Sequence, residues 1–475
     1  MSMQNKIRPL TKEAARIARK ARVVSVVPLL ALSLLLVSAT IAFGQANAAS
    51  DVFQTQTPPK TWIDADTGHR VIRLTDEPDS TALISGRNAF TPDGLDMIYT
   101  SPQGIHVLNL ATFKTKLIVS GRVNDVIAGT RTRRVFFVKM GQEYVCEIDT
   151  RQVTRISVSP IPLMSRFPHF QSVNADESLL VGTSIELRAQ DFNDFYSKAL
   201  REAHEQNEAS PANLPDLDDT KEKAKKMRLD AHVPESMFTL NLQTGEVRTI
   251  LKGTDWVDNV QFSPTDPNLI LYENDGPYMD TGVDRIWTIH ADGSQKQLIH
   301  RRATPDEIAT REFWSRDGKT IWYELHKPMP NKPASTDHYL VGYDVGTGKR
   351  GYYHLDELEY SVNYDAANDG SLFCGTGHPT KTAHGKAPKD DPITGSGEWI
   401  EVLHPILNNG DIGTSTQDAN SFRRERLVNM SRYPYDIVEP GVRFSPDNRL
   451  VIFTSDVYDT PNLYARSYVL AVEVN

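Results

Sequence analysis

Residues 90–99 read FTPDGLDMIY, and this stretch decides the fold because variants of it recur along the chain. Each copy combines a turn, usually containing Asp, with a strand rich in β-branched or aromatic side chains. Pro presets the first turn position, Asp bonds the following backbone, and Gly or Asn accepts a positive φ. The six further copies stand at residues 131–138, 174–181, 262–272, 314–323, 368–373 and 444–453.

Most copies begin about 40 to 50 residues apart, which is the length of a four-stranded propeller blade. We therefore predict an all-β fold, a seven-bladed β-propeller, formed by residues 49–475 as a single domain. The segment Trp62–Gly68 is expected to provide the closing strand beside the C-terminal blade, which removes exposed sheet edges. An open β-sandwich with the same number of strands is the alternative.

Two longer gaps between copies predict insertions near 186–232 and 378–397. In the first, Phe192, Phe195, Tyr196 and Leu200 recur at helical spacing, so the sequence predicts an amphipathic helix from Asp191 to Glu208. This helical insertion is expected to pack on the rim of the propeller.

The N-terminal 48 residues resemble a signal peptide, with seven Lys or Arg, an apolar run from Val23 to Phe43 and an A-x-A pattern at 46–48. We expect export to a periplasm or the exterior. If the run stays uncut, it is long enough to anchor the chain in a membrane. The segment carries a net charge of +6, so its removal takes the net charge from −9 to −15. Such an acidic protein disfavours nucleic acid as a partner.

Only two cysteines are present, Cys146 and Cys374, and both lie in apolar strand-like runs. Two buried thiols are the expected state, with a single bridge as the alternative. The sequence contains no phosphate-binding glycine loop, CxxC pair, HExxH or GxSxG motif. The thirteen histidines are scattered, and their spacing alone predicts no metal site.

Several segments together resemble the oligogalacturonate lyases, and the resemblance spans nearly the whole mature chain. They are TWIDADTGHRVIRLT at 61–75, RNAFTPDG at 87–94, NVQFSPTDP at 259–267, DGP at 275–277 with 283–287, REFWSRDG at 311–318, NYD at 363–365, and 439–456. The resemblance implies a seven-bladed propeller that cleaves short galacturonate chains by β-elimination with a divalent cation, typically manganese. In such a reaction a metal or Arg on the sugar carboxylate stabilises enolate-like charge while a base takes the C5 proton.

The family's site residues are largely replaced in this sequence. Asn259 stands where the family has its catalytic His, and Arg311 where it has a metal-binding His before Glu-Phe-Trp. Asp436, Glu439 and Gly441 stand where the family has a Gln-x-x-His-x-His run, and a family Arg falls near Ser236. We therefore name Arg311 and Asn259 as candidate catalytic residues, with Arg311 clamping a uronate carboxylate.

Asp436 and Glu439 are the candidate metal ligands, and Glu359 and Glu273 could join them. Such carboxylates suit calcium or manganese, although solvated rim acids are the alternative interpretation. Arg311 could instead form a salt bridge to Glu312, Glu307 or Glu439, and Asn259 could make an ordinary strand-turn hydrogen bond.

The sequence leaves three hypotheses for function. The first is a lyase for oligogalacturonates or a related uronate, whose partner is an acidic oligosaccharide. The second is a non-catalytic exported propeller that binds a glycan or a protein. The third is a different enzyme on the same scaffold, because propellers carry many chemistries.

Overall fold

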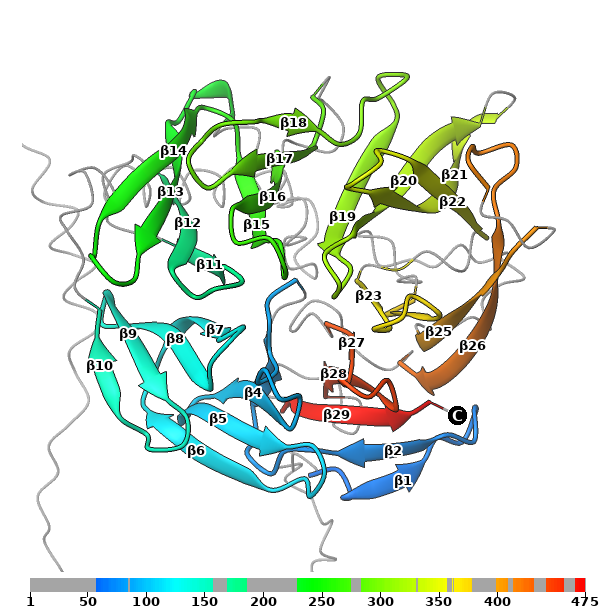
Figure 1. The fold of residues 1–475 in the computed structure, drawn as a ribbon. Coiled ribbons are helices and arrows are strands. Elements are labelled where there is room, and N and C mark those ends of the chain that lie inside the picture. Colours follow the sequence, from blue (N-terminus) through cyan, green and yellow to red (C-terminus); the bar gives the residue numbers. More distant parts are fainter. Residues whose placement is uncertain are drawn as a thin grey trace, which may run out of the picture. The chain divides into compact units, whose positions relative to one another are not determined.

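Every copy of the recurring turn joins the first and second strands of one antiparallel sheet (Figure 1). The computed structural model describes residues 57–83, 86–156, 169–185, 229–274, 283–329, 332–356, 361, 363–377, 399–408, 413–430, 441–456 and 466–474. Within this part of the chain we number the seven sheets as blades 1 to 7. The sheets surround a common centre, and the first strand of each blade lies innermost (Figure 1).

The strands of the first three blades follow the chain without exchange. Blade 1 contains β3 (Thr81–Ala82), β4 (Asp96–Ser101), β5 (Gly104–Asn109) and β6 (Thr115–Ser120). Blade 2 contains β7 (Asn124–Ala128), β8 (Arg134–Lys139), β9 (Gln142–Glu147) and β10 (Val153–Arg155). Blade 3 contains β11 (His169–Val173), β12 (Leu179–Ile185), β13 (Glu235–Asn241) and β14 (Val247–Gly253).

The next three blades repeat the same order, and blade 7 combines both ends of the propeller. Blade 4 contains β15 (Val257–Phe262), β16 (Leu269–Asn274), β17 (Ile286–His290) and β18 (Gln297–Leu298). Blade 5 contains β19 (Ile308–Trp314), β20 (Thr320–Met329), β21 (Lys332–Asp344) and β22 (Arg350–Leu355). Blade 6 contains β23 (Tyr364–Ala366), β24 (Phe373–Gly375), β25 (Trp399–Ile406) and β26 (Ser421–Asn429). Blade 7 contains β27 (Arg443–Phe444), β28 (Leu450–Ser455), β29 (Tyr468–Glu473), β2 (Arg70–Arg73) and β1 (Thr61–Ile63).

Hydrogen bonds from side chains within the recurring turn stabilise it. Thr91 Oγ1 donates to Asp93 Oδ1 at 2.6 Å, and the same carboxylate accepts the backbone N–H of Leu95 at 3.0 Å. Gly94 then takes a φ of 68°, which suits glycine because it lacks a Cβ. Equivalent hydroxyl–carboxylate bonds hold the turns at Ser315–Asp317 and Ser445–Asp447. Local side chains therefore hold these three turns, whereas the turn at Arg131 and Thr132 is held by the carboxylate of Glu177 in the next blade.

The N-terminal strands close the ring against the C-terminal blade. β2 pairs antiparallel with β29, and β1 adds outside β2. Most of Trp62–Gly68 forms the turn between β1 and β2, so the strand that closes the ring is Arg70–Arg73 rather than the segment predicted. Thr67 also ties this hairpin to blade 6 through a 2.7 Å bond from its hydroxyl to the carbonyl of Leu427. The closed ring confirms the seven-bladed propeller and excludes the open sandwich.

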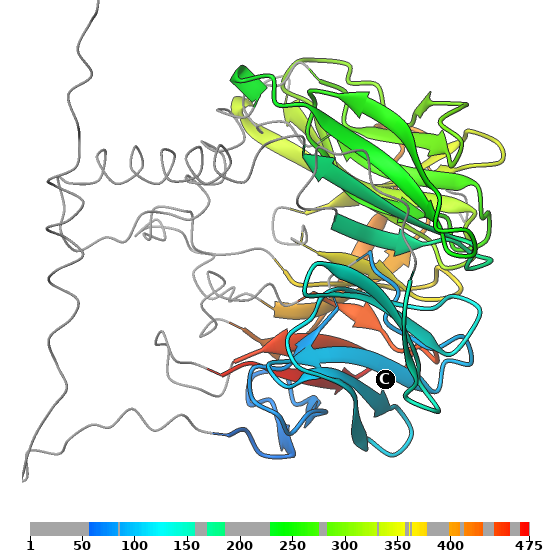
Figure 2. The same ribbon diagram turned by 90° about the vertical axis from the view of Figure 1, so that its left-hand side faces the viewer.

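The hydrophobic core lies between neighbouring sheets rather than at the centre of the ring. In blades 3 and 4, for example, Val181 and Met237 pack with Val260 and Tyr272. Comparable clusters bury the facing surfaces of the other blades. Figure 2 shows the same sheets from the side, where the twisted strands cross the thickness of the ring. Packing of this kind leaves the innermost strands to carry polar groups.

Both cysteines are buried and free, as the sequence predicted. The predicted signal peptide, the helix Asp191–Glu208 and most of both insertions lie outside the described residues. The first insertion departs and returns at neighbouring strand ends, because Ile185 of β12 pairs directly with Glu235 of β13. Among the described residues, no helix has the length and apolarity needed to span a bilayer.

Candidate active site

Two innermost strands of neighbouring blades carry the same irregularity. The pairing of β15 with β16 shifts register after Asp258, and the pairing of β19 with β20 shifts after Thr310. Asn259 and Arg311 lie inside these bulges with φ values of 50° and 57°. A left-handed backbone in a non-glycine residue costs roughly 1–3 kcal/mol, and bulges often re-aim side chains beside active sites. Both residues assigned to catalysis from the sequence therefore occupy equivalent strained positions.

Asn259 reaches across to the next blade and holds a buried acid. Its Nδ2 donates to Glu312 Oε1 at 2.6 Å and to the backbone carbonyl of Glu312 at 3.0 Å. Glu312 is 2 % exposed. Burial raises the pKa of this carboxyl well above its ordinary value, and the nearby charge of Glu273 raises it further. Asn259 therefore contacts an acid that favours the protonated form, which is more than the strand-turn bond considered from the sequence.

Glu273 is committed to an arginine. Its Oε1 accepts hydrogen bonds from Arg285 Nε at 2.9 Å, from Arg285 Nη2 at 2.6 Å and from Thr310 Oγ1 at 3.2 Å. This oxygen already has three donors. The structure therefore gives Glu273 Oε1 a salt-bridge role, and metal binding by Glu273 stays a prediction.

Arg311 pairs with a glutamate that the sequence analysis did not consider. Its Nη1 lies 2.8 Å from Glu324 Oε2, and the Arg311 side chain is 23 % exposed while that of Glu324 is 0 % exposed. Burial alone would raise the pKa of Glu324, but the charge of Arg311 and contacts from His326 and His338 outweigh it, so this pKa lies below its usual range. This salt bridge goes to Glu324 and not to the expected Glu312 or Glu307, because the β19–β20 register pairs Glu324 with Thr310, next to Arg311. Glu439, the third expected partner, lies outside the described residues.

Glu324, His326 and His338 form a compact group of potential metal ligands. Glu324 Oε1 lies 3.0 Å from His326 Nε2 and 3.5 Å from His338 Nδ1. One ligand atom from each residue lies within 4.8 Å of the others. Burial lowers the pKa of His326, which favours the neutral imidazole that metals bind. This group is the candidate cation site of the described residues.

The sequence contained a signal for this group that spacing alone did not reveal. Residues two apart on a strand face the same side, so Glu324 and His326 share a face of β20. His338 pairs directly with His326 across the β20–β21 hairpin. Sequence spacing alone did not indicate this group, because the hairpin register that brings His338 opposite His326 is not given by spacing along the chain.

The other predicted ligands cannot be placed. Asp436, Glu439 and Glu359 lie outside the described residues. Ser236, near the position of a family Arg, is buried in β13. Of the four site residues predicted from the sequence, the structure therefore places Asn259 and Arg311 on adjacent innermost strands, linked through Glu312, which follows Arg311 in the sequence.

The central cavity has a volume of about 400 Å³ and contains three arginines, Arg87, Arg316 and Arg443, among its lining residues. Arg316 contacts Asp365 at 3.1 Å. Arg443 donates to backbone carbonyls of Arg87 and Leu83, and burial lowers its pKa to about 10. Arg316 and Arg443 thus join neighbouring blades around the channel, whereas neither Arg311 nor Asn259 lines this cavity.

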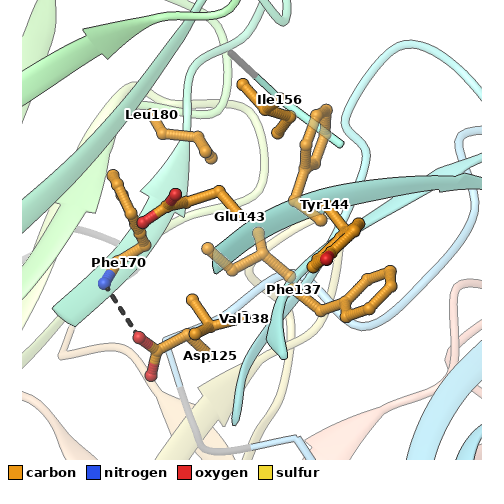
Figure 3. A pocket seen from close by; sticks show the side chains of 10 residues that line it. Asp125, Phe137, Val138, Glu143, Tyr144, Ile156, Phe170 and Leu180 are labelled. Atoms are coloured by element: carbon orange, nitrogen blue, oxygen red, sulfur yellow. Dashed lines mark hydrogen bonds between the residues drawn. The ribbon is translucent and has the colours of Figure 1, made fainter. Parts of the chain in front are cut away.

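A second, much smaller pocket lies between blades 2 and 3 (Figure 3). Asp125 Oδ2 there accepts the backbone N–H of Phe170 at 3.1 Å, and burial raises the pKa of Glu143. Its volume of about 10 Å³ has room for about one water molecule. This pocket is too small for a sugar.

These features define a closed seven-bladed β-propeller with buried ionisable groups on the inner strands of blades 4 and 5. The family model described as oligogalacturonate lyase matches residues 220–471. The chain belongs to this family, and it is an oligogalacturonate lyase-like protein, as the sequence resemblance predicted.

Named relatives agree with the family match. An oligogalacturonate lyase of Dickeya dadantii (strain 3937) is 25 % identical over 420 residues, which cover 85 % of this chain and 94 % of the relative. An oligogalacturonide lyase of Pectobacterium atrosepticum is 26 % identical over 240 residues, which cover 48 % of this chain and 54 % of the relative.

Two solved structures share the fold. One is an oligogalacturonate lyase in complex with manganese, with a TM-score of 0.62 and 19 % identity over 87 % of this chain and 96 % of the other. The second is an oligogalacturonate lyase from Vibrio parahaemolyticus, with a TM-score of 0.63, the same identity and the same coverage. At this identity the likeness supports the propeller architecture.

Proposed function

We propose that this chain cleaves oligogalacturonates by β-elimination, with Arg311 binding the carboxylate of the sugar that loses its C5 proton. Family membership supports the reaction class, and one observation carries the assignment of the residue. Arg311 stands on a strained bulge, its guanidinium is paired with Glu324 Oε2, and its side chain remains 23 % exposed. A partly exposed, pre-oriented cation can stabilise the enolate-like charge that develops on a uronate.

Asn259 acts in this proposal as a positioning residue. A carboxamide has no basic group in the physiological range, so it cannot take over proton abstraction from a histidine. Its two contacts to Glu312 instead fix the position of that acid, which follows Arg311 on β19. The base that takes the C5 proton must therefore be another residue.

A divalent cation fits the donors of the described residues, and its ligands would be Glu324, His326 and His338. When bound, such an ion supplies Lewis-acid stabilisation of an oxyanion. Asp436 and Glu439 remain predicted ligands outside the described residues. The identity of the uronate and of the cation belongs to the proposal.

The activity test uses the mature chain with digalacturonate and trigalacturonate, with and without manganese, zinc or calcium. We expect the absorbance of the unsaturated product to rise. The variant Arg311→Lys keeps the charge facing Glu324 but loses the planar fork, and we expect a fall in kcat/KM of at least about tenfold. A flat trace with every metal, in protein shown to be folded, would remove the lyase proposal.

A binding protein without catalysis is the second candidate, because Asn259 and Arg311 replace two histidines that the family resemblance implies. Calorimetry with trigalacturonate distinguishes the two functions. Binding of the sugar without product formation supports the non-catalytic propeller, whereas turnover supports the lyase.

Export is proposed on the composition of residues 1–48. N-terminal sequencing of protein recovered after expression tests it. A mature start at or near Ala49 supports cleavage and release, whereas an intact Met1 in the membrane fraction supports an anchored form.

A further inference from the structure

The β20–β21 hairpin presents a ligand set that differs from the carboxylates predicted from the sequence. It offers two imidazole nitrogens and one carboxylate oxygen, from His326, His338 and Glu324. All three come from one regular pair of strands, in which His326 faces His338 in register. Ligands on paired strands lose little conformational freedom on binding, because their backbones are already fixed.

The spacing of the ligand atoms matches that of a bound metal. A tetrahedral ion with bonds of about 2.1 Å separates its ligand atoms by about 3.4 Å. Glu324 Oε1 is 3.0 Å from His326 Nε2 and 3.5 Å from His338 Nδ1. The two imidazole rings have centroids 4.4 Å apart and are tilted by 58°. Small side-chain rotations would therefore complete the site without a change in the backbone.

Arg311 orients the carboxylate from outside the ligand set. It holds Glu324 Oε2 at 2.8 Å, which leaves Oε1 directed toward the two histidines. Partners of this kind fix metal ligands in many proteins, and their loss typically weakens metal binding roughly 10–100-fold. His326 and His338 are 16 % and 11 % exposed, so an ion there would keep a coordination position accessible from solvent.

We infer that Glu324, His326 and His338 bind one first-row transition-metal ion of the zinc type in preference to calcium. Imidazole ligands suit zinc, cobalt and nickel, whereas calcium requires six to eight oxygens. The ion and Arg311 share one glutamate, so the site keeps a net positive charge. If the proposed function is correct, this charge would face the carboxylate of the bound uronate.

The test measures metal binding in the absence of sugar. The full mature chain is stripped with a chelator and titrated by calorimetry with zinc and, separately, calcium. Cobalt is added as a spectroscopic probe, because its ligand-field absorption in the visible range reports coordination geometry. We expect one tight zinc equivalent per chain, weaker or undetectable calcium binding, and a four- or five-coordinate cobalt spectrum.

Two ligand variants and one matched control assign the site. His338→Gln and His326→Gln should each abolish the tight zinc equivalent and the cobalt bands. His354→Gln on the adjacent strand β22 should keep both, because His354 pairs with Asp337 and Asp356 instead. Circular dichroism establishes that each variant is folded. Unchanged zinc stoichiometry in the folded ligand variants, or no tight zinc in the wild type, would overturn the inference.

This outcome is separable from that of the activity test. Tight zinc lost in His338→Gln supports the metal site even if no sugar is cleaved. Product formation that is unaffected by zinc or by chelation supports the lyase while contradicting a catalytic part for this ion.

Discussion

Glu312 on β19 and Glu324 on β20 are both buried in blade 5, yet their environments drive their protonation in opposite directions. Burial raises the pKa of Glu312 well above the ordinary value and the negative charge of Glu273 raises it further, while the hydrogen bond from the Asn259 amide opposes this rise only in part. Glu324 receives the guanidinium of Arg311, so its pKa is lowered despite complete burial.

The comparison teaches that a buried acid stays neutral unless a positively charged partner lies beside it. Desolvation disfavours the ionised form of both residues, and only a nearby positive charge overcomes it. Paired groups whose pKa values are driven apart often mark acid and base roles in active sites. In this protein the two partners are the residues that replace the histidines expected from the family resemblance.

The largest expected effect comes from removing the cation. Arg311→Ala leaves Glu324 buried without its guanidinium, and breaking a buried pair costs about 3–5 kcal/mol. Because Arg311 is 23 % exposed, we expect a loss near the lower end, about 3 kcal/mol of the free energy of unfolding. Urea denaturation measures it.

Arg449→Ala is the control for this prediction, because its pair with Asp447 is exposed, at 79 % and 51 %. An exposed pair contributes about 0–1 kcal/mol. Equal losses in the two arginine variants would show that the Arg311–Glu324 pair is no stronger than a surface ion pair.

Removing the negative charge of Glu324 should lower the free energy of unfolding less than removing Arg311 does. Glu324→Gln keeps the side-chain volume and a hydrogen-bond acceptor, while Arg311 can turn partly to solvent. We expect a loss of about 2 kcal/mol, the usual contribution of a hydrogen bond to a charged group. If the variant is as stable as the wild type at pH 7, Glu324 is not ionised in the folded protein.

The pH dependence of stability should separate the two glutamates. Glu324 has a lowered folded-state pKa, so its stabilisation is present above the ordinary value of 4.5 and is lost as the pH falls through the folded pKa. Glu312 has a raised folded-state pKa, so its contribution is present below 4.5 and is lost as the pH rises toward the folded pKa. Each slope is at most about 1.4 kcal/mol per pH unit.

When the free energy of unfolding is plotted against pH, the two variants should therefore lose their slopes on opposite sides of the profile. Glu324→Gln removes the fall in stability on the acid side, and Glu312→Gln removes the fall above the ordinary carboxyl pKa. Two variants whose profiles run parallel to the wild type would contradict both assignments.

The smallest effect is expected for Glu312→Gln at pH 7. If Glu312 is already neutral, an amide of the same shape replaces it and Asn259 keeps a hydrogen-bond acceptor at this position. The change in unfolding free energy should then stay within about 1 kcal/mol. A loss as large as that of Glu324→Gln would mean that Glu312 is ionised.

The architecture followed from the sequence because its signals are local. The turn at Thr91–Asp96 is held by bonds between residues at most five apart, and the same hydroxyl–carboxylate bond recurs in each later copy with a Ser-x-Asp turn. The sequence predicted that an N-terminal segment closes the ring. It favoured Trp62–Gly68 for this role, whereas Arg70–Arg73 is the strand that pairs with β29. Alternation along a strand does not specify which of two neighbouring segments pairs with a distant one.

The seven blades, two buried thiols as the expected state of the cysteines, and Arg311 and Asn259 as replacements of family histidines could all be predicted from the sequence. Only the tertiary structure gave Arg311 its partner Glu324 and placed His326 opposite His338. The physical reason is that bulges and strand register set these contacts, and both depend on the whole blade rather than on neighbouring residues. The charge of a buried acid depends on these contacts, so the charge states of Glu312 and Glu324 follow from the folded structure and not from the sequence alone.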